Sequence, residues 1–245
     1  MISNKKVGEH HYRLTLKAPA IAGEAKPGQF IMLYLNKQDG VLLPRPFSIY
    51  LADKAKGEIV LLFEVRGCGT NILAKASEGS FFKVMGPLGR NFPDPSGQSL
   101  LLAGGMGIAP LVFLAASARV SMVMIYGAKT NQMLVCPPED LINPMVSVIR
   151  VTEDGSFGEK GTCLDFLEQY LANTVEIYAC GPMPMLSTVA DLGKQHKIKA
   201  WLSLEERMAC GIGACLGCVT ATAGGYKRVC ADGPVFPAEE VSFGE

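Results

Sequence analysis

The stretch Cys210-Gly-Ile-Gly-Ala-Cys215-Leu-Gly-Cys218 has the spacing C-x4-C-x2-C, and Cys230 follows after eleven more residues. Half of the eight cysteines of the chain therefore lie in this short region. The spacing is typical of plant-type [2Fe–2S] centres, and the glycines between the cysteines let the backbone come close to the sulfide. The stretch thus predicts a [2Fe–2S] cluster held by four thiolates: Cys210, Cys215, Cys218 and Cys230.

The residues between Cys218 and Cys230 predict a β-hairpin. Val219–Ala223 and Tyr226–Val229 are β-prone, and Gly224-Gly225 between them suits a two-residue turn. Such a hairpin returns Cys230 to the side of Val219 and so brings it close to Cys218.

Three other interpretations of the cysteines remain open. An even number of cysteines suits disulfides, although a C-x2-C spacing is tight for two bridges. Four thiolates can also hold a structural zinc ion, which usually shows two C-x2-C pairs rather than one. The spacing can also be a coincidence.

The composition limits the classes of function. The chain has 245 residues, enough for more than one domain, and 49% of them are apolar. The formal net charge is zero, so nothing indicates an electrostatic nucleic-acid or membrane partner. The first residues lack the apolar segment of a signal peptide, and together with free cysteines this predicts a cytoplasmic protein.

The span 100–118 is uncharged and long enough to suggest a membrane helix. Gly104, Gly105, Gly107 and Pro110 would disrupt such a helix, so we expect a strand, a loop and a helix instead.

The first part of the chain predicts a small antiparallel β-barrel followed by a proline-rich boundary at Pro87–Pro95. One helix is expected at Thr70–Ala76. We expect this domain to cover residues 1–94. Its predicted strands are His10–Lys17, Gln29–Leu35, Pro44–Leu51, Glu58–Val65 and Phe81–Met85.

Residues 95–204 alternate strands and helices, which predicts a doubly wound parallel sheet of the α/β class. Residues 205–245 form the cysteine arm, so the fold class is α+β and α/β in several domains. The predicted strands are Leu100–Ala103, Met122–Tyr126, Val146–Val151, Val175–Ala179 and Ala200–Leu204. The predicted helices are Pro110–Arg119, Cys163–Leu171 and Met183–Lys194.

Two motifs in the first domain suit phosphate and flavin recognition. Arg45-Pro46-Phe47-Ser48 offers a guanidinium for a phosphate and a hydroxyl for a flavin or ribose oxygen. The glycine turn before the helix at Thr70 lets a pyrophosphate approach the backbone. A surface arginine before a core phenylalanine, or an ordinary glycine turn, would look the same.

Two motifs in the second domain suit a dinucleotide. Gly104-Gly105-Met106-Gly107-Ile108-Ala109-Pro110 lies between a strand and a helix, as a dinucleotide loop does, although it is not G-x-G-x-x-G. Cys180-Gly181-Pro182 lies at the carboxyl end of a strand, where a thiol can touch a nicotinamide. The alternatives are a glycine turn that only permits close packing and a buried structural cysteine.

In this order, these motifs resemble the ferredoxin–NADP reductase superfamily. With Leu204-Glu-Glu-Arg-Met-Ala-Cys210 and the cysteine arm, nearly the whole chain is similar to the electron-transfer subunits of type B dihydroorotate dehydrogenases. The resemblance implies that the barrel binds FAD through Arg45, Pro46, Phe47, Ser48, Leu62, Phe63, Glu64, Gly69 and Thr70. It implies that the second domain binds NAD(H) through Gly104, Gly105, Gly107, Pro110, Cys180 and Gly181.

The resemblance also implies a partner, an FMN-bearing catalytic subunit that oxidises dihydroorotate in pyrimidine (UMP) biosynthesis, in a heterotetramer of two copies of each subunit. Nicotinamide carries hydride, a cluster carries one electron, and a flavin exchanges both. We therefore expect electrons to pass from FMN through the cluster and FAD to NAD⁺, with the cluster arm at the subunit interface and no catalytic residue beyond the cofactors.

Several points stay open. NAD rather than NADP follows only from the resemblance, because Tyr126-Gly-Ala-Lys129 offers a lone lysine and no acid. None of the three histidines lies in a motif, so all are expected to be surface or core residues. The same architecture can serve a hydrogenase, a sulfide dehydrogenase or a ferredoxin-linked transhydrogenase, and a zinc-bound interaction module is a remoter alternative.

Overall fold

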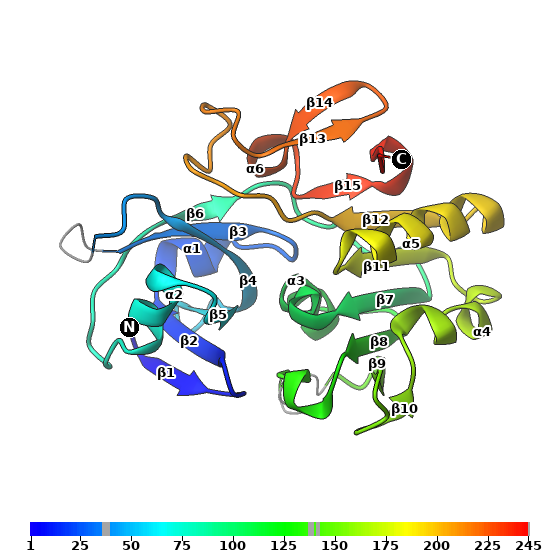
Figure 1. The fold of residues 1–245 in the computed structure, drawn as a ribbon, viewed down its shortest axis with the longest axis horizontal. Helices are drawn as coiled ribbons and strands as arrows, with labels where there is room; N and C mark the ends of the chain where they lie inside the picture. The colour runs from blue at the N-terminus through cyan, green and yellow to red at the C-terminus, as the bar shows by residue number, and fades with distance from the viewer. Residues whose placement is uncertain (36–39, 137–139, 141–142, 245) are drawn as a thin grey trace.

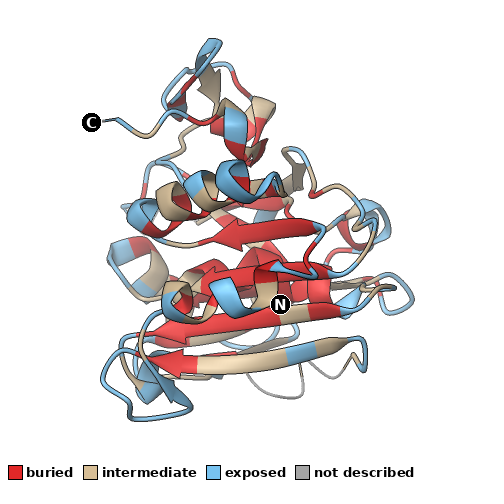
Figure 2. Ribbon diagram, turned by 90° about the vertical axis from the view of Figure 1, so that its right-hand side faces the viewer, coloured by how far each residue is buried: buried red, intermediate tan, exposed pale blue. Residues whose placement is uncertain are grey.

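The computed structural model describes residues 1–35, 40–136, 140 and 143–244. Figure 1 shows two lobes side by side, each built around a β-sheet, with the C-terminal segment lying across the top of both. Buried residues concentrate in the strands of the second lobe, whereas its helices turn an exposed face outward (Figure 2). This arrangement places the cysteine arm next to the junction of the two lobes.

The N-terminal lobe is a six-stranded antiparallel sheet, as predicted, in the order β1-β2-β5-β4-β3-β6. Its α2 helix (Cys68–Ala74) lies close to the predicted position, whereas β1 and α1 (Pro19–Glu24) were not predicted. The strands are β1 (Ser3–Lys6), β2 (His11–Lys17), β3 (Phe30–Tyr34), β4 (Arg45–Asp53), β5 (Glu58–Glu64) and β6 (Lys83–Leu88).

The two edges of this sheet approach each other. The amino group of Met1 donates to the carbonyl of Ser80 at 2.6 Å, and Gly79 N–H donates to the Met1 carbonyl at 3.0 Å. These bonds tie the chain before β1 to the chain before β6, so the sheet curls in the manner of a barrel around buried side chains. Those side chains include Leu14, Ile31, Leu33, Ile49, Ile59 and Leu61.

The second lobe has a seven-stranded sheet in the order β10-β9-β8-β7-β11-β12-β15. All of its pairings are parallel except that of β12 with β15, which comes from the C-terminal arm. The strands are β7 (Ser99–Gly104), β8 (Met122–Ala128), β9 (Val146–Thr152), β10 (Glu159–Lys160), β11 (Glu176–Cys180), β12 (Lys199–Ser203) and β15 (Val235–Pro237).

Helices cover both faces of this sheet, as a doubly wound fold requires. Leu100 and Leu102 of β7 share a core with α5 (Met183–His196), whereas Leu101 and Ala103 share the opposite core with α3 (Ile108–Ala116). The remaining short elements are η2 (Gly105–Gly107), η3 (Asn131–Met133), η5 (Cys163–Phe166) and α4 (Glu168–Leu171).

The uncharged span 100–118 forms most of β7 together with η2 and α3, which confirms the predicted strand, loop and helix. Within the described part of the chain, no helix combines the length and the apolar character that crossing a membrane requires.

The arm contains β13 (Val219–Thr222), β14 (Gly225–Arg228), α6 (Val229–Asp232), β15 and η6 (Ala238–Glu240). The predicted hairpin is present, but its turn was placed one residue too late. Thr222 pairs with Gly225, so the turn is Ala223-Gly224. The Thr222 hydroxyl also bonds the Gly225 carbonyl, which draws that glycine into the ladder.

Phe236 of β15 joins the arm to both lobes. Its side chain is 1% exposed and belongs to a core that also contains Phe30 and Met32 of β3 and Cys218 and Cys230 of the arm. A Cβ atom on Gly233 would lie 2.2 Å from the Phe236 ring, so the chain fits closely around this side chain.

We expect Phe236→Ala to lower the free energy of unfolding by about 3–5 kcal/mol, because it leaves a cavity where the arm meets the lobes. Urea denaturation of the full chain measures the loss. The control is Tyr226→Ala, whose ring is 80% exposed and should change stability by less than about 0.5 kcal/mol. Equal losses in the two variants would contradict this account of the arm.

Candidate functional site

A cavity of about 260 Å³, here called the barrel cavity, lies between the N-terminal lobe and the start of the arm. Eight of the nine residues predicted for flavin binding line it: Arg45, Pro46, Phe47, Ser48, Leu62, Phe63, Glu64 and Thr70. They come from β4, from β5 and from the first turn of α2. Met208 and Pro234 complete the wall from the arm.

Gly69, the ninth residue, lines a groove next to this cavity together with Arg45, Thr70 and residues 205–208. A Cβ atom at Gly69 would lie 2.8 Å from Nε of Arg45, so the guanidinium lies directly over this glycine. The hydroxyl of Thr70 accepts hydrogen bonds from the N–H groups of Arg66 and Gly67 at 3.0 and 3.2 Å. The Thr70 hydroxyl thus fixes the backbone of the glycine turn, and the Arg45 guanidinium places a positive charge next to it.

A cavity of about 730 Å³, here called the strand-end cavity, lies at the carboxyl edge of the parallel sheet. Four of the residues predicted to bind NAD(H) line it: Gly104, Gly105, Gly107 and Gly181. A Cβ atom at Gly107 would lie 2.0 Å from the carbonyl oxygen of Cys180, so only glycine lets the loop pack against the end of β11.

Two residues predicted to touch the dinucleotide lie behind this wall. The Cys180 side chain is 1% exposed, and burial raises the pKa of its thiol. Pro110 is buried in the first turn of α3. The strand end was predicted correctly, but the direction in which the Cys180 side chain packs could not be read from it.

Arg66 and Glu205 border both cavities and the groove, and neither was predicted. Nε of Arg66 donates to Oε2 of Glu64 at 2.6 Å. Glu205 is exposed at the edge of both cavities. The surrounding protein partly desolvates its carboxyl and raises the pKa, and Arg66 opposes the rise. The glycine turn next to Arg66 could have indicated this arginine from the sequence. Only the tertiary fold, in contrast, brings Glu205 next to the two cavities.

The strand-end cavity contains an acidic residue besides Lys129, so the prediction of a lone lysine was wrong. Glu153, directly after β9, lines it together with Lys129, directly after β8. The N–H of Glu153 donates to the Ala128 carbonyl at 3.1 Å, which fixes the backbone of the acid beside the lysine. The acid is thus supplied by the strand after the one that the sequence pattern indicated.

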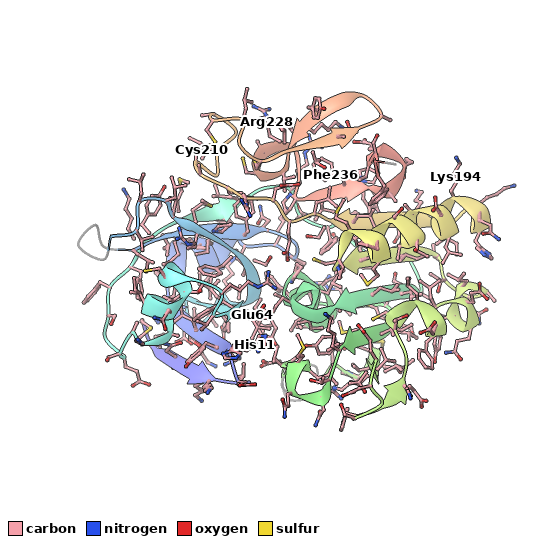
Figure 3. All side chains as sticks on the ribbon, viewed as in Figure 1. His11, Glu64, Lys194, Cys210, Arg228 and Phe236 are labelled. Atoms are coloured by element: carbon pink, nitrogen blue, oxygen red, sulfur yellow. The ribbon has the colours of Figure 1, made fainter. Side chains whose placement is uncertain are left out.

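His11 also lines the strand-end cavity, from the N-terminal lobe, and in Figure 3 it lies beside Glu64 at the side facing the second lobe. The residue is 6% exposed, and its Nδ1 atom has no hydrogen-bond partner among the residues that the structure describes. Burial lowers the pKa of the imidazole, against the influence of Glu64. The sequence predicted a surface or a core position for each histidine. His11 has a core position, and it is also part of a cavity wall.

The four cysteines of the arm lie in two hydrogen-bonded pairs, Cys210 with Cys215 and Cys218 with Cys230. Backbone N–H groups point at their sulfurs. Gly213 N–H lies 3.1 Å from Sγ of Cys230, and Cys230 N–H lies 3.4 Å from Sγ of Cys218.

The surroundings of Cys210 and of Cys230 shift the pKa values of their thiols in opposite directions. Hydrogen bonds from the N–H groups of Ile212 and Cys215 lower the pKa of Cys210 to about 6. Burial, together with the neighbouring Cys218 thiol, raises the pKa of Cys230 to about 12. Cys210 is thus prepared to bind metal as a thiolate, whereas Cys218 and Cys230 are buried.

This arrangement fits a two-iron cluster. Two pairs of thiols provide two ligands for each iron, and the N–H donors suit cluster sulfurs. A Cβ atom at Gly211 would lie 2.5 Å from Met32, so the loop needs glycine to fold against β3. Among the described residues, no three His, Cys, Asp or Glu side chains gather as they would around a single metal ion.

Comparison with known proteins agrees with this geometry. The family model for the iron–sulfur cluster binding domain of dihydroorotate dehydrogenase B matches residues 205–242, and the oxidoreductase FAD-binding domain matches residues 2–92. The electron transfer subunit of dihydroorotate dehydrogenase B (NAD(+)) from Desulforamulus reducens is 37% identical over 96% of this chain and 94% of its own length. The chain belongs to this family of electron transfer subunits.

The family member from Caldanaerobacter subterraneus subsp. tengcongensis is likewise 37% identical, over 99% of this chain and 97% of its own. As the family name states, such a subunit serves a dihydroorotate dehydrogenase, which implies a catalytic partner. FAD-binding and cluster-binding domains together with a reductase-like fold make the chain an NAD-linked flavin and iron–sulfur oxidoreductase subunit.

Solved structures confirm the fold. A chain of the NADH-dependent reduced ferredoxin–NADP oxidoreductase superposes with a TM-score of 0.88 at 27% identity, over 98% of this chain and 88% of that one. The ferredoxin reductase of carbazole 1,9a-dioxygenase superposes with a TM-score of 0.66 at 19% identity, over 80% of this chain and 64% of that one. The second likeness shows the reductase fold alone.

In the iron-free protein, we expect iodoacetamide to label Cys210 with a rate that rises through about pH 6, because its thiolate forms well below the usual thiol range. Cys230 should stay unlabelled at neutral pH, because its pKa is raised and its side chain is buried. Mass spectrometry of peptides after labelling between pH 5 and 9 measures both rates. Labelling of Cys210 only above pH 8 would contradict the assigned hydrogen bonds.

Proposed function

We propose that this chain passes electrons from a partner's FMN centre to NAD⁺ in pyrimidine biosynthesis, with the residues of its barrel cavity, strand-end cavity and arm holding FAD, NAD(H) and the [2Fe–2S] cluster. One observation carries the proposal: the barrel cavity shares Glu64, Arg66, Met106 and Glu205 with the strand-end cavity. The barrel cavity also takes Met208, two residues before Cys210, from the arm.

The shared walls give each group a role. Arg45 and Arg66 supply positive charge for the pyrophosphate of FAD, Ser48 supplies a hydroxyl for the flavin, and Phe47 and Phe63 supply apolar surface. Gly104, Gly105 and Gly107 let a dinucleotide lie on the backbone at the strand ends. When bound, a flavin exchanges hydride with nicotinamide and single electrons with a cluster, so it belongs in the central cavity.

The proposed path of electron transfer, here called the wiring, is tested by adding NADH to the purified chain without oxygen. We expect the flavin absorbance to bleach and the electron paramagnetic resonance signal of a reduced cluster to appear. Cys218→Ser should lose iron and the signal while the flavin still bleaches, whereas Cys68→Ser, at an exposed cysteine outside the arm, should keep its iron. A bleached flavin beside an intact, never reduced cluster would refute the wiring, and a preparation without iron would refute the cluster.

We further propose that the arm forms the interface with the FMN-bearing subunit, in a heterotetramer of two copies of each. Apolar side chains gather around the cysteines and are exposed: Ile212, Leu216, Val219 and Tyr226. Exposed apolar residues next to a redox site are typical of a docking surface, and tyrosine is enriched among the residues that dominate binding energy.

We expect Tyr226→Ala to weaken binding of the catalytic subunit about tenfold, the equivalent of about 1.4 kcal/mol, because it removes a large anchor from this surface. Phe81→Ala is the control, since Phe81 is 93% exposed on the N-terminal lobe, outside the arm. Titration of the separate subunits by calorimetry measures both. Weaker binding in the Phe81 variant alone would place the interface elsewhere.

Glu153 supports NAD rather than NADP as the acceptor. Its carboxylate lines the strand-end cavity, whereas the neighbouring Asp154 is engaged by Ser156 N–H and hydroxyl at 2.9 and 2.6 Å. A carboxylate at a strand end accepts hydrogen bonds from the ribose hydroxyls and repels a 2′-phosphate. Lys129 is the only opposing charge at the end of β8 within the described cavity wall.

We expect Glu153→Gln to weaken NAD⁺ binding about tenfold and to strengthen NADP⁺ binding, because a charged acceptor is lost and the repulsion is removed. Asp154→Asn is the matched control and should leave the ratio of the two affinities unchanged. Equilibrium titration with each nucleotide gives the ratio. The assignment fails when Glu153→Gln leaves the ratio at its wild-type value.

The likeness to the NADH-dependent reduced ferredoxin–NADP oxidoreductase supports a second candidate, a ferredoxin-linked transhydrogenase subunit of the same architecture. Co-purification separates the two: an FMN protein that oxidises dihydroorotate supports the first, and a second nucleotide-reducing flavoprotein supports the other. A cytoplasmic location, as expected from the sequence, suits both candidates, because thiolate ligands persist in a reducing compartment.

A further inference from the structure

One ion pair in the arm flanks Cys230, the last of the four cysteines. Arg228 ends β14 and Asp232 ends α6, so the pair spans the helix that contains Cys230. Oδ2 of Asp232 accepts from Nε of Arg228 and from its backbone N–H, both at 2.9 Å, and Oδ1 accepts from Nη2 at 3.2 Å. The guanidinium is therefore held at two of its nitrogens.

The third nitrogen reaches the other cysteine segment. Nη1 of Arg228 donates to the carbonyl oxygen of Gly213 at 3.2 Å, and Gly213 lies between Cys210 and Cys215. The N–H of the same glycine donates to Sγ of Cys230 at 3.1 Å. Both polar groups of Gly213 are thus held by the segment 228–232.

The close fit around Gly213 leaves no room for a side chain at this position. Its φ is +80°, and a Cβ atom there would lie 2.9 Å from Cβ of Ala231 and 3.0 Å from Nη1 of Arg228. Figure 3 shows Arg228 and Cys210 together on the arm, away from His11 and Glu64. A partly exposed ion pair four residues apart contributes little to stability, so fold stability alone does not account for this geometry.

We propose that Arg228, oriented by Asp232, is a positioning residue of the cluster site: it clamps the Cys210–Cys215 loop against Cys230 and keeps the Gly213 N–H directed at the Cys230 sulfur. This inference rests on the proposed cluster. Hydrogen bonds to ligand sulfurs and nearby charge set the potential of such clusters, and groups that orient ligands control retention of the metal. The clamp therefore determines both how firmly iron is held and the midpoint potential.

The sign of the effect on the potential follows from the charges. The arginine and the aspartate balance each other. Arg90 acts on Asp232 more weakly, so removal of the Arg228 guanidinium leaves the carboxylate only partly compensated beside the thiolates. An added electron is then less favourable, and the midpoint potential falls.

The experiment uses the full chain with its cluster in four variants: Arg228→Gln, Arg228→Lys, the double variant Arg228→Gln with Asp232→Asn, and Lys227→Gln. The last is the matched control. Lys227 is the preceding residue and pairs with Glu240, so its replacement removes the same charge from the same hairpin without touching the cysteine loop. The measurements are the midpoint potential by electron paramagnetic resonance titration and the rate of iron release to a chelator.

Arg228→Gln should shift the midpoint to more negative values and release iron about tenfold faster. Arg228→Lys keeps the charge but not the three directed bonds, so it should keep the midpoint near wild type and still release iron faster. The double variant should recover the midpoint and not the retention. The proposal is overturned when Arg228→Gln matches Lys227→Gln in both measurements. A wild-type protein without iron would instead refute the cluster itself.

Discussion

The pairing of β15 with β12 determines where the redox site is assembled. Only three residue pairs form this antiparallel ladder, from Trp201 with Pro237 to Ser203 with Val235. They fix the C-terminal arm at the edge of the parallel sheet, and Phe236 then fills the space between the arm and β3. Because the chain leaves β12 at Ser203 and returns at Val235, the cysteine loop between them must lie over the junction of the lobes.

This placement explains why the three binding regions share walls. The segment 205–208 runs from the end of β12 to the first cysteine and lines the barrel cavity on its way. The glycine loop after β7 reaches the same cavity from the other lobe through Met106. A group bound in the barrel cavity is therefore adjacent both to the strand ends and to the arm, without any long connecting segment.

Much of the fold could be predicted because its signals are local. The glycine loop between β7 and α3 and the cysteine spacing each depend on a few consecutive residues, and the alternating strands and helices have clear periodicity. What failed depends on tertiary packing. Nothing local shows that Cys180 is buried, that Glu153 and Lys129 line one cavity from the ends of neighbouring strands, or that Glu205 borders both cavities. Likewise, the predicted hairpin turn was wrong by one residue, because the hydrogen bond from the Thr222 hydroxyl competes with the preference of glycine for turn positions.

The composition of the two cavity walls has a consequence for the order of events in turnover. Every described residue that lines the strand-end cavity comes from position 205 or earlier, so neither the cysteine loop nor the hairpin contributes to it. A partner docked on the cysteine loop and the hairpin, as proposed above, would therefore not have to leave for the nucleotide to exchange. Such an assembly would suit repeated turnover as a lasting complex better than a shuttling carrier would.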